Sequence, residues 1–188
     1  MKIVFATQNQ NKADEIASIL PNHIQVLTLS DLNHNQELEE SSDTLQGNAE
    51  QKAKFIFEKY GHPCFADDTG LLIKSLNNEP GVYSARYAGE EKNNEANMDL
   101  VLSKLESNVD RSAKFMTVIA FASENGLEIY EGEVKGQITL ERRGEEGFGY
   151  DPIFLPEGSE KTFAEMSLEE KNEISHRARA FKNFIERF

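Results

Sequence analysis

The chain has 188 residues, of which 38% are hydrophobic and 28% are charged, a composition typical of a folded globular protein. Its net charge of −13 argues against a nucleic-acid partner, because polynucleotides are bound mainly through Lys and Arg contacts to phosphates. Every apolar stretch is shorter than the roughly 20 residues that span a bilayer, so no membrane partner is expected. A polyanionic ligand would need local attraction, from a cation and a few converging basic side chains.

The N-terminal segment, Met1 to Thr7, is too short for a secretory signal, and its apolar run from Ile3 to Ala6 predicts the first strand. Cys64 is the only cysteine, so no disulfide can form within the chain and a cytoplasmic location is expected. No linker or internal repeat divides the sequence. We therefore expect a single domain over residues 1–188, with room for two lobes.

A polar segment, Thr7 to Lys12, follows the first strand and precedes a helix that is predicted to continue to Leu20. The first turn of such a helix presents free N–H groups and the positive end of its dipole, and Lys12 adds a full charge. This arrangement suits a phosphate. The segment lacks the glycines of a nucleotide-binding fingerprint, however, so an ordinary capped helix explains the spacing better.

Three elements are predicted before the middle of the chain. Ile24 to Leu29 is expected to form a second strand, Asn33 to Asp43 an exposed acidic loop, and Thr44 to Tyr60 a second helix. Lys52 and Lys54 lie in this helix and are expected to be solvated surface lysines.

Two adjacent carboxylates, Asp67 and Asp68, follow an apolar run from Pro63 to Ala66 that predicts a buried strand. The Asp-Asp-Thr-Gly sequence is predicted to form the turn that leaves this strand, with Gly70 at a positive φ. Adjacent carboxylates repel each other, and Mg²⁺ is the cation best suited to compensate them, since it binds carboxylate and phosphate oxygens together. The alternative is a solvated turn or a helix cap.

The second half of the chain predicts antiparallel strands. Pro80 to Gly89 is a loop with two tyrosines around an arginine, and Asn93 to Leu105 is helical. Phe115 to Ala122 and Leu127 to Leu140 predict a hairpin around an Asn-Gly turn. Long antiparallel strands exclude a purely parallel sheet, so the fold class is α/β with a mixed sheet.

The Gly- and Pro-rich segment Gly144 to Pro156 presents Phe148 and Tyr150 on either side of a glycine. It is either a base-stacking platform or a simple connection. Ser167 starts a capping box. The last helix carries an apolar stripe that belongs to the core or to a dimer interface: Ile174, Ala178, Phe181, Ile185 and Phe188.

Five sequence blocks, in this order, closely resemble the inosine triphosphate pyrophosphatase family. They are Thr7-x-Asn9-x-x-Lys12, Ala66-Asp67-Asp68-Thr69-Gly70, Gly81-Val82-Tyr83-Ser84-Ala85-Arg86-Tyr87, Phe148-Gly149-Tyr150-Asp151-Pro152 and Ser175-His176-Arg177. The resemblance implies a homodimer with an elongated mixed β-sheet flanked by helices, in two lobes around a nucleotide cleft. It also implies Mg²⁺-dependent hydrolysis of ITP, dITP and XTP to the monophosphate and pyrophosphate.

The resemblance also implies roles for individual residues. Asp68 matches the catalytic carboxylate, and Glu40 and Asp68 match the metal ligands. The substrate contacts implied are Thr7, Gln8, Asn9, Gln10, Asn11, Lys12, Lys52 and Thr69, with Phe148, Gly149, Tyr150, Asp151, Lys171, His176 and Arg177. Two departures are visible: Gln8 replaces a common glycine, and a glycine is missing after the acidic pair, which leaves Glu39 as an alternative to the preferred Glu40.

The implied contacts near the C-terminus constrain the shape of the last helix. Successive residues of a helix are rotated by about 100°, so Lys171, His176 and Arg177 on one straight helix would point in three widely separated directions. We therefore predict a break near Ile174 and Ser175, with Ser175 capping the final helix.

Two other functions fit the same features. One is a related pyrophosphatase that acts on modified pyrimidine or methylated nucleotides. The other is a nucleotide sensor that binds the triphosphate without turnover.

Overall fold

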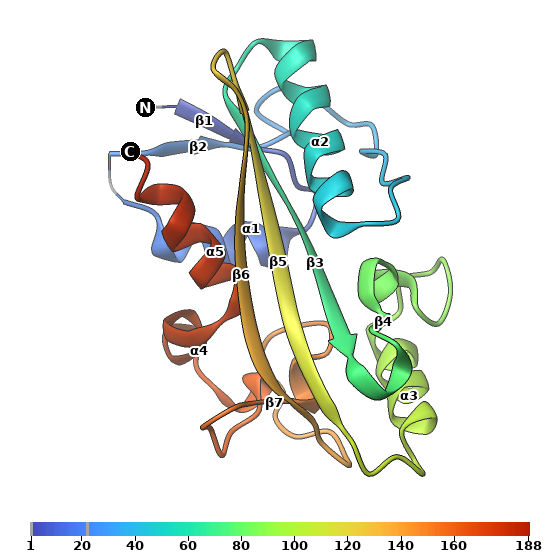
Figure 1. Cartoon of the computed structure of the whole chain (residues 1–188). Helices are drawn as coiled ribbons and strands as arrows, with labels where there is room; N and C mark the ends of the chain where they lie inside the picture. Colours follow the sequence, from blue (N-terminus) through green and yellow to red (C-terminus); the bar gives the residue numbers. More distant parts are fainter. Residues whose placement is uncertain (1, 22) are drawn as a thin grey trace. The chain divides into compact units, whose positions relative to one another are not determined.

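The structure is a computed structural model that describes residues 2–21 and 23–188 (Figure 1). Its helices and strands are, in chain order, β1 (Lys2–Phe5), α1 (Gln10–Ile19), β2 (Gln25–Leu27), α2 (Leu45–Tyr60), β3 (Cys64–Ile73), β4 (Glu79–Pro80), α3 (Asn94–Lys104), β5 (Ser112–Ser123), β6 (Gly126–Ile138), β7 (Phe154–Pro156), α4 (Leu168–Ile174) and α5 (His176–Ile185). Short 3₁₀ helices are η1 (Lys74–Leu76), η2 (Gly81–Arg86), η3 (Asp151–Ile153) and η4 (Phe163–Glu165). Met1, at the edge of the predicted first strand, lies outside the described residues.

The strands form one mixed sheet in the order β2-β1-β3-β5-β6-β7, with β4 paired to β3 outside this path. β1 pairs in parallel with β2 and β3, whereas β4 with β3 and β7 with β6 are antiparallel. The predicted α/β class, with a mixed sheet flanked by helices, is confirmed.

The chain divides into two compact units. Unit 1 contains the residues up to Asp68 together with Thr117–Gly132 and Ala178–Phe188, and unit 2 contains Thr69–Met116 and Glu133–Arg177. Each unit therefore combines segments that are far apart in the sequence.

The core of unit 1 lies on both faces of its strands. Phe5 and Phe65 stack with ring centroids 4.4 Å apart, and Phe181 and Phe184 of α5 pack on Phe65. Ile16 of α1 belongs to the same cluster. Figure 1 shows α2 on the opposite side of these strands from α1 and α5. Alternate residues of β3 therefore face different helices.

The core of unit 2 is a buried cluster that includes side chains of β3, β5 and β6. Phe115 of β5 contacts Phe154 and Phe163, with ring centroids 4.7 and 6.1 Å apart. Met98 and Val101 of α3 join the same buried cluster. This core supports the loops that follow β6.

The predicted turn at Asp67 to Gly70 is wrong, because β3 continues as one strand from Cys64 to Ile73. β1 pairs with β3 at Cys64 and Phe65, β4 pairs with it at Leu72 and Ile73, and β5 lies on its other side. These pairings hold the intervening residues extended, and the local turn preference of Asp-Asp-Thr-Gly is overridden.

Most other predicted elements are confirmed. α2 ends at Tyr60, and Gly61 closes it in the left-handed conformation with φ 69°. The final helix breaks as predicted, since α4 ends at Ile174 and α5 begins at His176. The second strand is shorter than predicted, at three residues.

The apolar stripe of the last helix belongs to the core only in part. Phe181 is fully buried together with Ala180 and Phe184, and Ile185 packs against this cluster. Phe188, the end of the predicted stripe, is 40% exposed. The buried stripe is thus rotated relative to the one expected.

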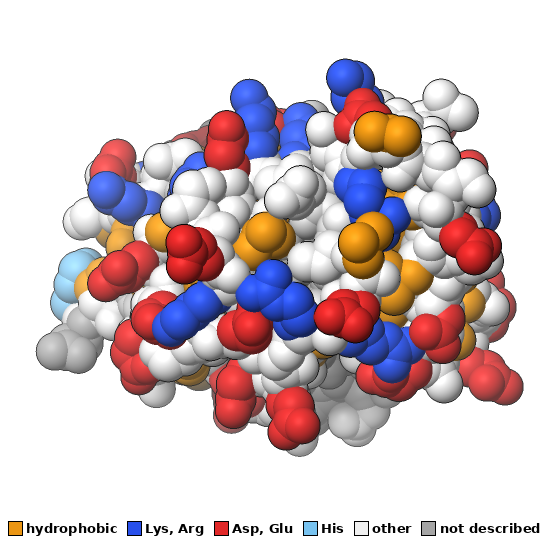
Figure 2. Space-filling model, turned by 90° about the horizontal axis from the view of Figure 1, so that it is seen from below, with side chains coloured by type: hydrophobic (Ala, Val, Ile, Leu, Met, Phe, Trp, Pro, Cys, Tyr) orange, Lys and Arg blue, Asp and Glu red, His pale blue; other side chains and the backbone are white. Residues whose placement is uncertain are grey.

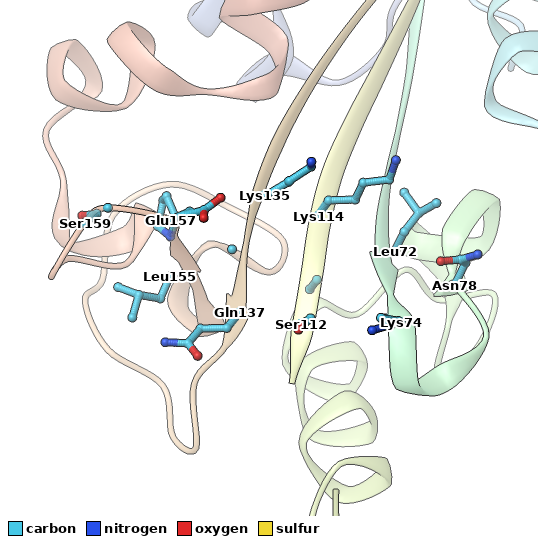
Figure 3. Close-up of a pocket in the computed structure, with 14 residues that line it drawn as sticks. Leu72, Lys74, Asn78, Ser112, Lys114, Lys135, Gln137, Leu155, Glu157 and Ser159 are labelled. Carbon is cyan, nitrogen blue, oxygen red and sulfur yellow. The ribbon is translucent and has the colours of Figure 1, made fainter. Parts of the chain in front are cut away.

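The surface carries mixed charge. On the face shown in Figure 2, acidic and basic side chains are interspersed, with apolar side chains in small groups. The surface of unit 2 has a hollow of about 630 Å³ that Lys114 and Lys135 enter from the neighbouring strands β5 and β6, with Leu72 and Leu155 among its lining residues (Figure 3). Within residues 2–21 and 23–188, the helices are too short or too polar to cross a membrane.

Gly144 provides a test of the packing in unit 2. Its φ is +84°, and a Cβ there would lie 2.1 Å from the carbonyl oxygen of Ala164. Gly158 has a similar φ of +80° but open space around it. We expect Gly158→Ala to cost about 1–2 kcal/mol for the left-handed conformation, and Gly144→Ala to cost about 1–3 kcal/mol more, because backbone atoms must move.

Urea unfolding of both variants checks this prediction, with Gly158→Ala as the matched control. Equal losses in the free energy of unfolding would contradict the close approach of Gly144 to Ala164.

Candidate functional site

Asp67 and Asp68 are both buried and point to opposite faces of β3. Oδ2 of Asp67 lies 3.0 Å from the Lys12 ammonium of α1. Oδ2 of Asp68 accepts a hydrogen bond of 3.1 Å from the amide of Asn48 in α2. The two carboxylates are therefore stabilised by different helices, and the alternative of a solvated turn is wrong.

Lys52 of α2 interacts with the charges of Asp67 and Asp68, and only 6% of its surface is exposed. Its ammonium contacts Oε1 of Glu40 at 2.5 Å and the backbone carbonyl of Asp67 at 2.8 Å. Burial lowers the pKa of Lys52, but the charges of Asp68, Glu40 and Asp67 outweigh it and leave the pKa above its usual value. The prediction of a solvated side chain is wrong for Lys52, although it holds for the exposed Lys54.

Burial raises the pKa of Asp68, and the charges of Lys52 and Lys12 only partly oppose this effect. The charge of Glu40 raises the pKa further, so the two carboxylates are close enough to interact. The two carboxylates therefore offer hard oxygen donors that both interact with the Lys52 ammonium.

Mg²⁺ commonly takes one or two protein carboxylates and completes its shell with water and substrate phosphate. The described part of the chain contains no group of three or more His, Cys, Asp or Glu side chains that could hold a metal by itself. Glu40 and Asp68 fit the Mg²⁺ pattern. Glu39 is exposed, so the geometry favours Glu40 as the partner of Asp68.

The segment from Thr7 to Lys12 forms a capped helix start, as predicted. Oδ1 of Asn9 accepts from the backbone N–H of Lys12, and the hydroxyl of Thr7 accepts from the N–H of Asn9. Gln8 donates its amide to the carbonyl of Gln36, which links this segment to the acidic loop. Gln10 and Asn11 are exposed, and a phosphate-binding role for the segment stays a prediction.

In unit 2, Asp151 joins the Phe148 loop, which comprises residues 139–150 between β6 and η3, to α4. Its Oδ2 lies 2.6 Å from the ammonium of Lys171, and both side chains are only 4% exposed. The same oxygen accepts from the backbone N–H of Phe148 at 2.8 Å. Breaking this ion pair would leave a buried charge unpaired, so the loop is held firmly.

Two cations face the ring of Phe148. The ammonium of Lys171 lies 5.0 Å from the ring centroid, and the guanidinium carbon of Arg177 lies 5.6 Å from it. Arg177 also donates to the hydroxyl of Thr69 at 3.2 Å. Unit 2 thus gathers Phe148, Asp151, Lys171, Arg177 and Thr69 into one cluster.

Two residues of the predicted site pack into the interior of unit 2. His176 stacks on Phe115 with ring centroids 4.6 Å apart and an angle of 16°. Tyr150 is buried, and its hydroxyl donates to the carbonyl of Ser84 at 2.7 Å. Gly149, between Phe148 and Tyr150, has a positive φ of 65°.

The sequence analysis missed Asn48, which is buried and connects Asp68 to the acidic loop by accepting from the N–H of Ser42 at 2.9 Å. Asn48 lies one helical turn before Lys52, beside the apolar stripe of α2. Two polar residues spaced four apart on the buried side of a helix are a signal that could have found both.

Comparisons with known proteins cover the whole chain. The model of the Ham1 family matches residues 3–187. A relative from Christiangramia forsetii, named dITP/XTP pyrophosphatase, is 53% identical over 186 residues, covering 99% of this chain and 98% of that protein. A relative of the same name from Flavobacterium johnsoniae is 52% identical, covering 99% and 97%.

Solved structures of Ham1 proteins share the fold of this chain. The Staphylococcus aureus Ham1 protein matches with a TM-score of 0.90 at 39% identity, covering 99% of this chain and 98% of that one. A HAM1 protein from Coxiella burnetii matches with a TM-score of 0.89 at 38% identity, covering 98% and 96%. With matches over nearly its full length in sequence and in fold, the chain belongs to the Ham1 family.

Proposed function

We propose that the chain hydrolyses the non-canonical purine nucleoside triphosphates ITP, dITP and XTP to the nucleoside monophosphate and pyrophosphate. The names of the relatives from Christiangramia forsetii and Flavobacterium johnsoniae support this substrate class. The observation that carries the proposal is the buried Lys52, whose ammonium is paired with the partly exposed Glu40 and whose charge acts on the buried Asp68. This arrangement combines two oxygen donors and a fixed cation, as phosphoryl chemistry requires.

Glu40 and Asp68 would hold Mg²⁺, which when bound neutralises negative charge on the phosphate oxygens. Lys52 holds Glu40 in place and lowers the pKa of Asp68 against the effect of burial. Burial prevails and leaves the pKa of Asp68 raised in the protein without bound metal. Asp68 is also the acidic side chain of β3 that lies on the same face as Lys52 and Asn48. It would accept the proton of the water that attacks the α-phosphorus.

Lys12, at the first turn of α1, would bind phosphate oxygens together with the free N–H groups of the helix start. The family resemblance implies that Lys171 contacts the substrate, where its ammonium could stabilise charge on the phosphates. Its buried pair with Asp151 favours a role in holding the Phe148 loop.

Selectivity would come from the cluster in unit 2. Phe148 offers a ring face for the purine, and the guanidinium of Arg177, whose carbon lies 5.6 Å from the centroid of that ring, carries N–H donors. A donor aimed at position 6 of the purine pairs with the carbonyl of hypoxanthine or xanthine. In adenine, position 6 carries an amino group, which is itself a donor. The amino group and the protein N–H would then both lack an acceptor, which weakens the binding of ATP.

The proposal also includes a homodimer in the cytoplasm with no nucleic-acid or membrane partner. The sequence resemblance supports the dimer, and the net charge of −13 supports the absence of a nucleic-acid partner. The single cysteine, buried in β3, suits a reducing compartment.

A substrate panel tests the function. Pyrophosphate release is measured from ITP, XTP, dUTP, a methylated triphosphate, ATP and GTP. We expect ITP and XTP to be hydrolysed with kcat/KM at least about a hundredfold above ATP, since unpaired buried donors give large discrimination. Preference for dUTP or the methylated nucleotide would indicate the pyrimidine or methylated class, and ITP binding without pyrophosphate would indicate a sensor.

Asp68→Asn should fold and bind nucleotide but turn over ITP at least about a hundredfold more slowly, because the base is lost. Asp67→Asn is the matched control, with the same chemical change one residue away on the other face of β3. It should lose about tenfold or less, through the weakened position of Lys12. Circular dichroism verifies folding, and near-normal turnover of Asp68→Asn would remove Asp68 from its role.

Glu40→Gln should raise the Mg²⁺ concentration for half-maximal activity by at least about tenfold, because an oxygen ligand loses its charge. Glu39→Gln, the matched control, should leave that concentration unchanged. Magnesium titrations of pyrophosphate release from ITP measure both. The reverse result would assign the metal to Glu39.

A further inference from the structure

Ser84 connects three segments of unit 2 without belonging to the proposed nucleotide contacts. It lies in η2 and is buried. Its hydroxyl accepts from the backbone N–H of Leu71 at 2.9 Å and donates to the carbonyl of Gly81 at 2.6 Å. Leu71 is in β3, three residues after Asp68, so Ser84 ties η2 to the strand that carries the proposed catalytic carboxylate.

The backbone carbonyl of Ser84 makes a second connection. It accepts from the hydroxyl of Tyr150 at 2.7 Å, and Tyr150 belongs to the same loop as Phe148. Burial raises the pKa of the Tyr150 hydroxyl, with a smaller contribution from Tyr87, so the group remains a neutral donor. This bond joins residues 66 positions apart in the sequence.

Asn97 of α3 fixes η2 from the other side. Its buried amide donates to the carbonyl of Ala85 at 2.9 Å and accepts from the N–H of Ala88 at 2.7 Å. The backbone around Ser84 is thereby immobilised, and a group that is bonded to it is immobilised as well.

The Phe148 loop is therefore held at two points. Asp151 ties it to Lys171 of α4, and Tyr150 ties it to Ser84. Phe148 precedes both attachments and is separated from them by Gly149, where the backbone takes a positive φ. The orientation of its ring depends on both.

We propose that Ser84 is a positioning residue for base recognition, which locks the Phe148 loop to the part of β3 that follows Asp68, and that the Tyr150 hydroxyl serves this lock rather than touching the nucleotide. The proposal rests on the proposed function, because it assigns Phe148 to the purine. A substrate contact by the Tyr150 hydroxyl would require it to leave Ser84 and the interior.

Tyr150→Phe removes one oxygen and keeps the ring in the core. We expect the KM for ITP to rise about fivefold, as for the loss of one hydrogen bond, with kcat within about twofold of wild type. Tyr87→Phe is the matched control, because it removes a tyrosine hydroxyl from the adjacent, exposed contact with Glu79 and Lys104. Its KM should stay at the wild-type value.

Ser84→Ala leaves the N–H of Leu71 without its acceptor. We expect a higher KM and also a lower kcat, because the strand near Asp68 is loosened as well as the loop. In the double variant Ser84→Ala/Tyr150→Phe, the combined loss of kcat/KM should be smaller than the product of the single losses, since both changes release the same loop.

Amide hydrogen exchange provides a readout that needs no turnover. Exchange at Leu71 should be faster in Ser84→Ala, and exchange at Phe148 and its neighbours should be faster in Tyr150→Phe, each by at least about tenfold relative to Tyr87→Phe. Unchanged exchange would overturn the lock. Faster exchange with an unchanged KM would overturn the positioning role, because the contacts would then be merely structural.

The two proposals fail differently. If the wild-type protein hydrolysed none of the triphosphates, the proposed function would fall, while the exchange measurements would still decide whether Ser84 and Tyr150 form the lock. If the wild type hydrolysed ITP and Tyr150→Phe matched Tyr87→Phe in KM, only the inference about Ser84 would fall.

Discussion

Successive side chains of a β-strand point to opposite faces of the sheet, and this constraint organises the carboxylates of β3. It separates Asp67 from Asp68, which would repel each other if they shared one side. Asp67 meets Lys12 from α1, and Asp68 meets Asn48 from α2. Helices on both faces are therefore needed to bury the pair, and the layered sheet supplies them.

The same arrangement recurs in each unit: a buried lysine of an α-helix pairs with a carboxylate that restricts a neighbouring loop. In unit 1, Lys52 of α2 holds Glu40, and in unit 2, Lys171 of α4 holds Asp151. A buried ammonium is tolerated only when it is paired, so each contact strongly restricts its loop. An acidic chain thereby fixes two loops with few basic residues.

Local signals allowed much of this fold to be predicted. The end of α2 at Gly61 follows from capping chemistry, which depends on nearby residues. The break at Ser175 follows from helix geometry together with the substrate contacts that the family resemblance implies for Lys171, His176 and Arg177. The course of β3 and the burial of Lys52 could not be predicted in this way. They depend on strand pairing and on charges brought from distant segments, which overrule the turn preference of Asp-Asp-Thr-Gly and the usual exposure of lysine.

The boundary between the two units falls inside β3, between Asp68 and Thr69. Asp68, whose carboxylate interacts with Lys52, and Thr69, whose hydroxyl accepts from Arg177, are thus joined by one peptide bond, with Cα atoms about 3.8 Å apart across a trans bond. The spacing along β3 is equally constrained. Inserting or deleting one residue in this strand would move every later side chain of the strand to the opposite face of the sheet.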